Sequence, residues 1–121
     1  MKINHVDGFL IQTFKTASGK EPFTEWLESI NNKKIKSRIK KEIDKLQYTK
    51  NTYSGNRKRL SENLYEIKIS LGPGYRIYFT ILDNSIAIIL CGGTKDSQTD
   101  DIKLANTYLK ECKEINEVGN D

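Results

Sequence analysis

The fold is decided by residues 64–82, which read LYEIKISLGPGYRIYFTIL. Apolar and polar side chains alternate on both sides of Gly72-Pro73-Gly74, a pattern typical of two antiparallel strands joined by a turn. One face of this hairpin receives the apolar set Tyr65, Ile67, Ile69, Leu71, Tyr75, Ile77, Phe79 and Ile81. Because neighbouring side chains in a strand point to opposite faces, the other face receives Glu66, Lys68, Arg76 and Tyr78.

Further strands are predicted on either side of the hairpin. Residues 85–91 follow an Asp83-Asn84 turn and complete a three-stranded meander. A first strand is expected over residues 8–15, where apolar and polar side chains alternate, and residues 57–60 are a candidate short strand. The loop before that candidate covers residues 48–56.

Three helices are expected. Pro22 suits the first turn of a short helix, whose apolar positions are Phe23, Trp26, Leu27 and Ile30. A second helix covers residues 33–47 and forms a hairpin with the first; its apolar stripe is Ile35, Ile39, Ile43 and Leu46. The last helix begins near Asp96 or Ser97, and its tail is expected to fray after Ile115.

The resulting order is β-α-α-β-β-β-α, which predicts an α+β fold with an antiparallel sheet. Such a sheet packs helices on one face and can leave the other face open to a ligand. A chain of 121 residues is too short for two cores, so residues 1–121 are expected to form one domain.

Membrane insertion and secretion are not expected. The longest apolar run, residues 86–91, is six residues, whereas a membrane-spanning helix needs about 20. The first ten residues include Lys2 and Asp7 and lack the apolar stretch of a signal peptide. A cytoplasmic location is therefore expected, with Cys91 and Cys112 as reduced, buried thiols.

The net charge of +4 is unevenly distributed. From Lys95 onward four basic and seven acidic residues give −3, so residues 1–94 carry +7. A basic body favours a polyanionic partner such as nucleic acid, and a solvated lysine-rich surface explains the same numbers. Likewise, the polar face of the hairpin is either an RNA-binding groove or a solvent-exposed face on which Glu66 pairs with Lys68 or Arg76.

Several stretches together resemble the addiction-module killer branch of the RelE/ParE toxin superfamily, the HigB-like toxins of type II toxin–antitoxin pairs. They are residues 23–27 (FTEWL), the basic helix, residues 55–58 (GNRK), 64–68 (LYEIK), 72–79 (GPGYRIYF) and 90–98 (LCGGTKDSQ) with 101–102 (DI). The resemblance covers about Phe23 to Leu109. It implies the RelE-like fold: a twisted antiparallel sheet, an N-terminal helical hairpin and a C-terminal helix.

The resemblance also implies a function. Free toxins of this kind cleave mRNA in the ribosomal A site without a metal or other cofactor, and the RNA 2′-hydroxyl attacks the adjacent phosphate. A cognate antitoxin, expected here to contain a helix-turn-helix, silences the toxin, and operator DNA is bound only through their complex. The single histidine, His5, excludes a mechanism that needs two histidines, and no cluster of metal-ligating residues is present in the sequence.

Site residues follow from the matched motifs. Arg76 matches the arginine of the family's GYR segment, Lys68 matches a catalytic lysine, and Lys95 lies where RelE has a catalytic arginine. Glu66 replaces a second lysine and is an alternative general base, while the base-stacking tyrosine position falls near Asp100 or Asp101. Expected RNA-binding residues are Arg57, Lys58, Tyr75, Tyr78, Gln98, Lys34, Arg38 and Lys41.

Two other functions remain open at this point. ParE-like proteins share the fold and inhibit DNA gyrase without cleaving RNA, and a third reading is a protein that only binds a host factor. The cations Lys68, Arg76 and Lys95 favour the nuclease, since a gyrase inhibitor does not require them.

Overall fold

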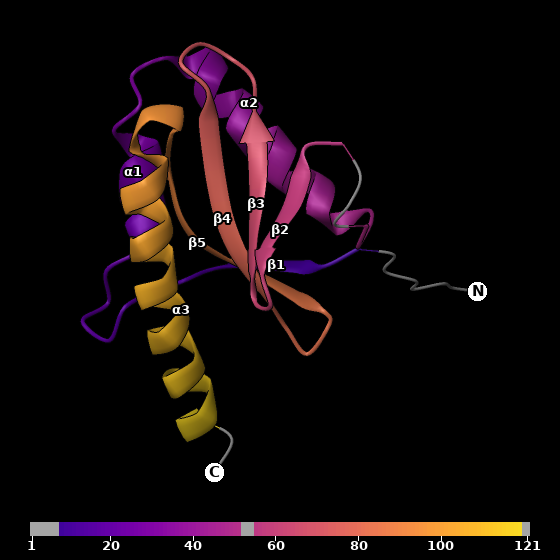
Figure 1. The fold of residues 1–121 in the computed structure, drawn as a ribbon, viewed down its shortest axis with the longest axis vertical. Helices are drawn as coiled ribbons and strands as arrows, with labels where there is room; N and C mark the ends of the chain where they lie inside the picture. Colours follow the sequence, from indigo (N-terminus) through magenta and orange to yellow (C-terminus); the bar gives the residue numbers. More distant parts are fainter. Residues whose placement is uncertain (1–7, 52–54, 120–121) are drawn as a thin grey trace.

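The computed structural model describes residues 8–51 and 55–119, so His5 and part of the predicted loop over residues 48–56 lie outside the described residues. The elements follow the chain in the order β1, α1, α2, β2, β3, β4, β5 and α3 (Figure 1). Their bounds are β1 Leu10–Thr13, α1 Pro22–Glu28, α2 Lys33–Asp44, β2 Arg57–Ser61, β3 Leu64–Ile69, β4 Tyr75–Leu82, β5 Ile86–Thr94 and α3 Gln98–Gly119. Short 3-10 helices follow α2 at Lys45–Gln47 and precede α3 at Lys95–Ser97.

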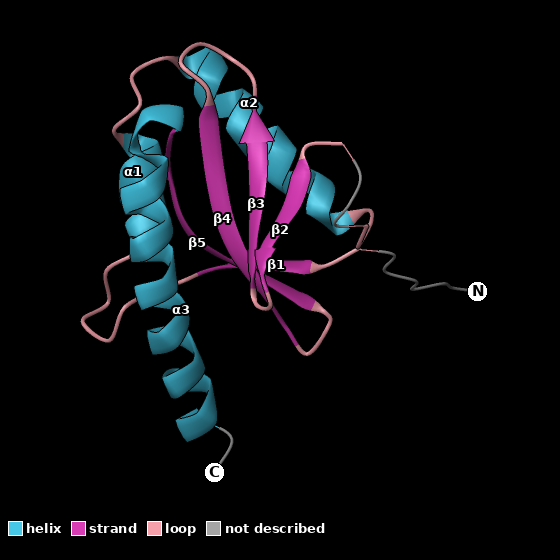
Figure 2. Ribbon diagram, viewed as in Figure 1, coloured by secondary structure: helices cyan, strands magenta, loops and turns pink. Residues whose placement is uncertain are grey.

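The predicted α+β class is confirmed, but the sheet is mixed rather than antiparallel. Its order is β1-β5-β4-β3-β2, and β1 pairs with β5 in parallel while every other neighbouring pair is antiparallel (Figure 2). The candidate strand at residues 57–60 is confirmed as the edge strand β2. Side-chain alternation does not specify strand direction, which is why the parallel pair was not predicted.

Helices α1 and α2 pack on one face of the sheet, here called the α1/α2 face. The side chain of Asn32 caps α2 by accepting hydrogen bonds from the backbone nitrogens of Lys34 at 2.9 Å and Ile35 at 3.1 Å. The apolar stripes predicted for both helices meet the apolar residues of β3 and β4; the buried members are Phe23, Leu27, Ile39, Ile43, Leu46, Ile67, Ile69, Tyr75, Ile77 and Phe79. Trp26 lies against Gly92, where any side chain would collide with the indole ring.

The opposite face, here called the α3 face, was expected to be open, and this expectation is correct only in part, because α3 covers β5 and β4 while Lys58 on β2 and Lys68 on β3 remain exposed. Helix α3 packs on it against β5, β4 and β3, on the other side of the sheet from α2 (Figure 1). A bulge in β5 pairs Tyr78 with Cys91 and Phe79 with Ile89, so that both Leu90 and Cys91 join the α3 core. The predicted burial of Cys91 and Cys112 is confirmed.

Several predicted ends differ from the structure. Strand β1 covers Leu10–Thr13 of the expected residues 8–15, and α2 ends at Asp44, after which the chain forms a 3-10 helix. Strand β5 was expected to end at Cys91 and instead continues through Gly92 and Gly93 to Thr94. Helix α3 continues to Gly119, and the expected fraying after Ile115 stays a prediction. Within the described ranges, no helix combines the length and apolar character needed to cross a membrane.

Candidate anion-binding site

The turn between β3 and β4 builds one wall of the candidate site. Gly72 and Gly74 have φ angles of 57° and 87°, a region that residues with a side chain rarely adopt. The backbone nitrogen of Gly74 donates to the carbonyl oxygen of Leu71 at 3.0 Å and closes the turn. The carbonyl oxygen of Gly74 accepts from the backbone nitrogen of Lys95 at 3.0 Å, which ties the turn to the segment between β5 and α3.

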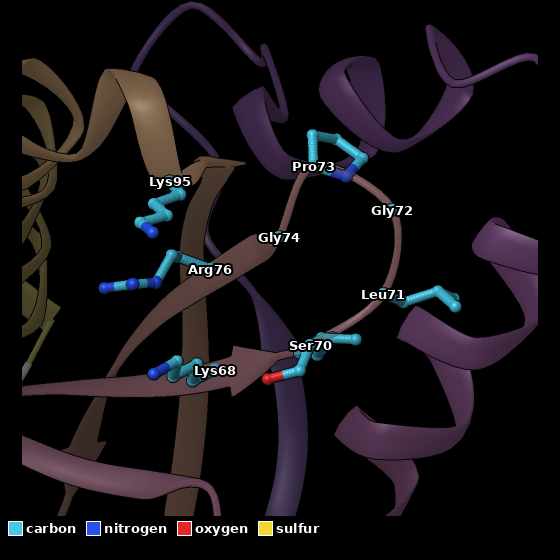
Figure 3. Close-up of a pocket in the computed structure, with 9 residues that line it drawn as sticks. Lys68, Ser70, Leu71, Gly72, Pro73, Gly74, Arg76 and Lys95 are labelled. Carbon is cyan, nitrogen blue, oxygen red and sulfur yellow. The ribbon is translucent and has the colours of Figure 1, made fainter.

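A pocket of about 400 Å³ lies beside this turn; its lining is Lys68, Ile69, Ser70, Leu71, Gly72, Pro73, Gly74, Arg76 and Lys95. Lys68 and Arg76 are directly opposite each other on β3 and β4, and Lys95 follows the end of β5. Figure 3 shows the nitrogen ends of these three side chains on the same side of the hairpin. Three strands thus bring three cations to one pocket.

Arg76 is held in place by Glu66. Its Nη1 donates to Glu66 Oε1 at 2.8 Å, and the two side chains are only 12% and 4% exposed. The Nε of Arg76 is also buried and has no hydrogen-bond acceptor in the part of the chain that the structure describes. Arg76 nevertheless lines the pocket, and Glu66 engages only its Nη1, so the guanidinium keeps the capacity to bind an anion there.

The two lysines of the pocket are exposed and uncompensated. No carboxylate within residues 8–51 or 55–115 forms an ion pair with Lys68 or Lys95. Glu66 neutralises one of the three cations and does not line the pocket itself. The net positive charge and the planar guanidinium suit a phosphate or another oxyanion.

The structure does not bring Tyr75 or Tyr78 into the pocket. Tyr75 is buried on the α1/α2 face, where its ring centroid lies 6.2 Å from that of Trp26. Tyr78 is fully buried beneath α3, and burial raises the pKa of its hydroxyl above the ordinary value, with a further contribution from the charge of Glu66. Neither ring is presented to a ligand on the surface.

Arg57 is also buried and turned away from the pocket. Its Nη1 donates to the carbonyl oxygens of Thr49 at 2.8 Å and Asn51 at 3.2 Å. Burial lowers the pKa of Arg57 from its usual value, while the nearby charge of Glu42 acts in the opposite direction. Arg57 therefore binds the backbone of the preceding loop at Thr49 and Asn51 and does not line the pocket.

The other predicted RNA-binding residues are more accessible. Lys58 is exposed on β2 and pairs across the sheet with Glu66, which puts it on the α3 face. Gln98 is half-buried at the first position of α3. Lys34, Arg38 and Lys41 are exposed on α2, and Arg38 donates from its Nε to Glu42 Oε2 at 3.0 Å.

Sequence reasoning named Ser97 and Asp101 but missed the contacts by which they connect β5 to α3. The hydroxyl of Ser97 accepts from the backbone nitrogen of Thr94 at 3.2 Å and donates to the carboxylate of Asp101. That carboxylate occupies the space where a side chain at Gly93 would lie. Two consecutive glycines at the end of a strand were the available signal, because such a pair marks a close approach of other groups to the backbone.

No family model matches the chain. A comparison with curated proteins finds an uncharacterized protein of Haemophilus influenzae that is 34% identical over 89 residues. The aligned residues make up 74% of this chain and 87% of that relative.

Proposed function

We propose that this chain, which belongs to the same family as the uncharacterized Haemophilus influenzae protein, is the RelE/HigB-like toxin of a type II toxin–antitoxin pair. Its proposed activity is metal-independent endonucleolytic cleavage of mRNA, carried out on the ribosome. The observation that carries the proposal is the convergence of Lys68, Arg76 and Lys95 on one pocket. The resemblance of the GPGYR and GGTKDSQ stretches to that toxin branch supports it.

The proposed reaction uses the cations of the pocket. The 2′-oxygen forms a bond to the adjacent phosphorus, the bond from phosphorus to the 5′-oxygen breaks, and a 2′,3′-cyclic phosphate results. Arg76 is suited to stabilise the negative charge that develops on the phosphoryl oxygens, because its guanidinium is already oriented by Glu66. Lys68 takes the proton of the 2′-hydroxyl as a neutral amine or, as an ammonium, clamps the phosphate, and the ammonium of Lys95 donates a proton to the departing 5′-oxygen.

Glu66 receives a positioning role in this proposal. A general base must come within hydrogen-bond reach of the proton that it removes. The carboxylate of Glu66 is buried, bonded to Arg76 and absent from the pocket lining. Holding Arg76 is therefore the role that its contacts support.

The wider RNA surface would include residues outside the pocket. Lys58 extends the positive charge along the α3 face, and Lys34 and Lys41 carry it onto α2. The first turn of α2 adjoins the β3–β4 turn, since a side chain at Gly72 would contact Ile35. Phosphate groups of mRNA and of the ribosome are the partners that such a surface suits.

The test compares two double variants in cells. Lys68→Ala with Lys95→Ala removes two exposed cations that hold no ion pair among the described residues, so the fold should be retained. Lys103→Ala with Lys110→Ala removes the same charge from exposed positions on α3 that do not line the pocket. We expect the first variant to lose growth arrest and mRNA cleavage, measured by primer extension after induction, and the second to retain both.

Two outcomes would contradict the proposal. Growth arrest by the wild-type protein without any mRNA cleavage would favour the ParE-like inhibition of gyrase, or the binding of a host factor. Full cleavage by the pocket variant would show that the chemistry lies elsewhere. A single Arg76→Ala variant is less decisive, because it also leaves the buried carboxylate of Glu66 without its cation.

A further inference from the structure

The segment from Gly93 to Asp101 places Lys95 at the pocket, although the side chain of Lys95 is exposed and has no carboxylate partner in the described part of the chain. An exposed lysine samples many rotamers, so its location depends mainly on where the backbone holds it. Two sets of contacts hold this backbone. One is the hydrogen bond from Lys95 to Gly74, and the other is the network of Thr94, Ser97 and Asp101.

Asp101 closes this network from the first turn of α3. Its carboxylate accepts from the hydroxyl of Ser97, which in turn accepts from the backbone nitrogen of Thr94, the residue before Lys95. The same hydroxyl also contacts the carbonyl oxygen of Thr94 at 3.3 Å. The side chain of Ser97 therefore links Asp101, at the start of α3, to Thr94, at the end of β5.

The absence of a side chain at Gly93 makes this link possible. A methyl group there would overlap the carboxylate of Asp101 and would lie 3.0 Å from the hydroxyl of Ser97. Asp101 is half-buried and its carboxylate lies against Gly93 of β5, and its charge adds to the effect of burial in raising the pKa of Cys91 to about 12. Its neighbour Asp100 is exposed and has no such contacts among the described residues.

We propose that Asp101 is a positioning residue that, through Ser97, fixes the start of α3 and thereby orders Lys95 for binding an oxyanion in the pocket. The inference rests on the proposed function for its physiological substrate, a phosphodiester of RNA. For anion binding itself we claim only that Asp101 acts through Lys95, so its effect should vanish when Lys95 is removed. That dependence separates positioning from a general contribution to stability.

The experiment is a double-mutant cycle that uses inorganic phosphate as the probe. Binding is followed by the NMR shifts of the backbone amides of Lys95 and Gly74, in the wild-type protein, Asp101→Ala, Lys95→Ala and the double variant. We expect Asp101→Ala to weaken phosphate binding about fivefold, the order expected when the backbone segment that carries Lys95 must be ordered on binding instead of beforehand. In the Lys95→Ala background the same substitution should change binding by less than a factor of about 1.5.

Controls separate this effect from loss of fold and from loss of charge. Asp100→Ala removes an equal charge from the same helical turn and should leave phosphate binding unchanged. Ser97→Ala interrupts the network at its centre and should weaken phosphate binding as Asp101→Ala does. It serves as the test if Asp101→Ala folds poorly.

Equal losses in both backgrounds would overturn the inference, as would an equal effect of Asp100→Ala or the absence of phosphate-dependent shifts in the wild-type protein. The result is independent of RNA cleavage. Coupling between Asp101 and Lys95 in a protein that does not cleave mRNA would support the positioning role and reject the nuclease. Cleavage of mRNA by a protein in which the two residues are not coupled would support the nuclease and reject the positioning role.

Discussion

Glu42 and Glu66 are two buried glutamates beside arginines, and they lie on opposite faces of the sheet. Glu42 accepts three hydrogen bonds: from Arg38 and Lys45, each at 3.0 Å, and from Asn56 at 2.9 Å. Within the described residues, Glu66 accepts one side-chain hydrogen bond, from Arg76. We call these groups the Glu42 cluster and the Glu66 cluster.

The clusters differ most in what remains unsatisfied. In the Glu42 cluster Arg38 and Lys45 form ion pairs with the carboxylate. The neighbouring Arg57 donates to a carbonyl oxygen of the loop before β2. In the Glu66 cluster Arg76 Nε has no acceptor among the described residues, and the guanidinium lines a pocket together with the exposed lysines Lys68 and Lys95. A completed polar network holds a structure together, whereas donors left without acceptors suit a group that arrives from outside.

The largest expected effect is the loss of stability when the Glu66 cluster is broken. Glu66→Ala leaves the guanidinium of Arg76 buried without its carboxylate, which should destabilise the fold by about 3 kcal/mol. Urea unfolding measures this difference. Glu66→Ala combined with Arg76→Met should recover much of it, because two apolar groups need no partner. A loss below about 1 kcal/mol for the single variant would mean that the pair is effectively solvated.

A smaller effect is expected for Glu42→Gln, since Arg38 and Lys45 are about half exposed and can turn to water. We expect a loss of about 1–2 kcal/mol at neutral pH. Burial alone would raise the pKa of Glu42, but hydrogen bonds from Lys45, Asn56 and Arg38 outweigh it and hold the pKa below its usual value of 4.5.

The lowered pKa of Glu42 fixes the direction of the pH dependence. The carboxylate binds protons less readily in the folded state than in the unfolded state, so its contribution is complete above about pH 5.5 and declines as the pH falls through 4.5 and below. Unfolding of the wild-type protein and Glu42→Gln across pH 3–7 should therefore give curves that converge in acid. A difference that persists unchanged at pH 3 would contradict the assignment.

Of the two clusters, the sequence could predict only the Glu66 cluster, because it lies on the β3–β4 hairpin. Alternation along residues 64–82 correctly placed Glu66 and Arg76 on one face, and the pairing of the two is one of the alternatives it left open. The Glu42 cluster was not predicted, because it joins residues of α2 to a loop through contacts that no local period encodes.

Long-range packing explains the remaining differences. The parallel pairing of β1, the bulge in β5 and the position of α3 all depend on how distant segments dock. These features bury Tyr78 and place Asp101 against Gly93. The three cations of the pocket were nevertheless brought together as expected, since two belong to the hairpin and the third follows the adjacent strand.

Phosphate should stabilise the protein by binding in the pocket that Lys68, Arg76 and Lys95 line. At ten times its dissociation constant a ligand adds about 1.4 kcal/mol, which corresponds to about 5.5 °C in melting temperature for a domain of this size. Thermal melts with and without inorganic phosphate, at constant ionic strength, measure the shift. Lys68→Ala with Lys95→Ala should abolish it, and Lys103→Ala with Lys110→Ala should not. Equal shifts in the two variants would place the anion outside the pocket.

The smallest expected effect is on the salt dependence of RNA binding by the basic surface of α2. It should differ between the two lysines and the arginine on that surface. Lys34 and Lys41 are exposed and hold no ion pair in the described residues, whereas Arg38 belongs to the Glu42 cluster. Each free lysine that meets an RNA phosphate displaces a counterion, so Lys34→Ala and Lys41→Ala should each lower the salt slope of binding by about 0.7. Fluorescence anisotropy of a labelled single-stranded RNA at several salt concentrations measures this slope.

Arg38→Ala should change the salt slope less than either lysine variant and lower stability more, because its charge is already engaged by Glu42. The affinity losses should be similar for RNAs of different sequence, since phosphate contacts carry no sequence information. If Arg38→Ala instead changes the slope as much as Lys41→Ala does, RNA competes with Glu42 for the arginine. The Glu42 cluster would then open on binding, and the distinction between a complete and an incomplete cluster would hold only for the unbound protein.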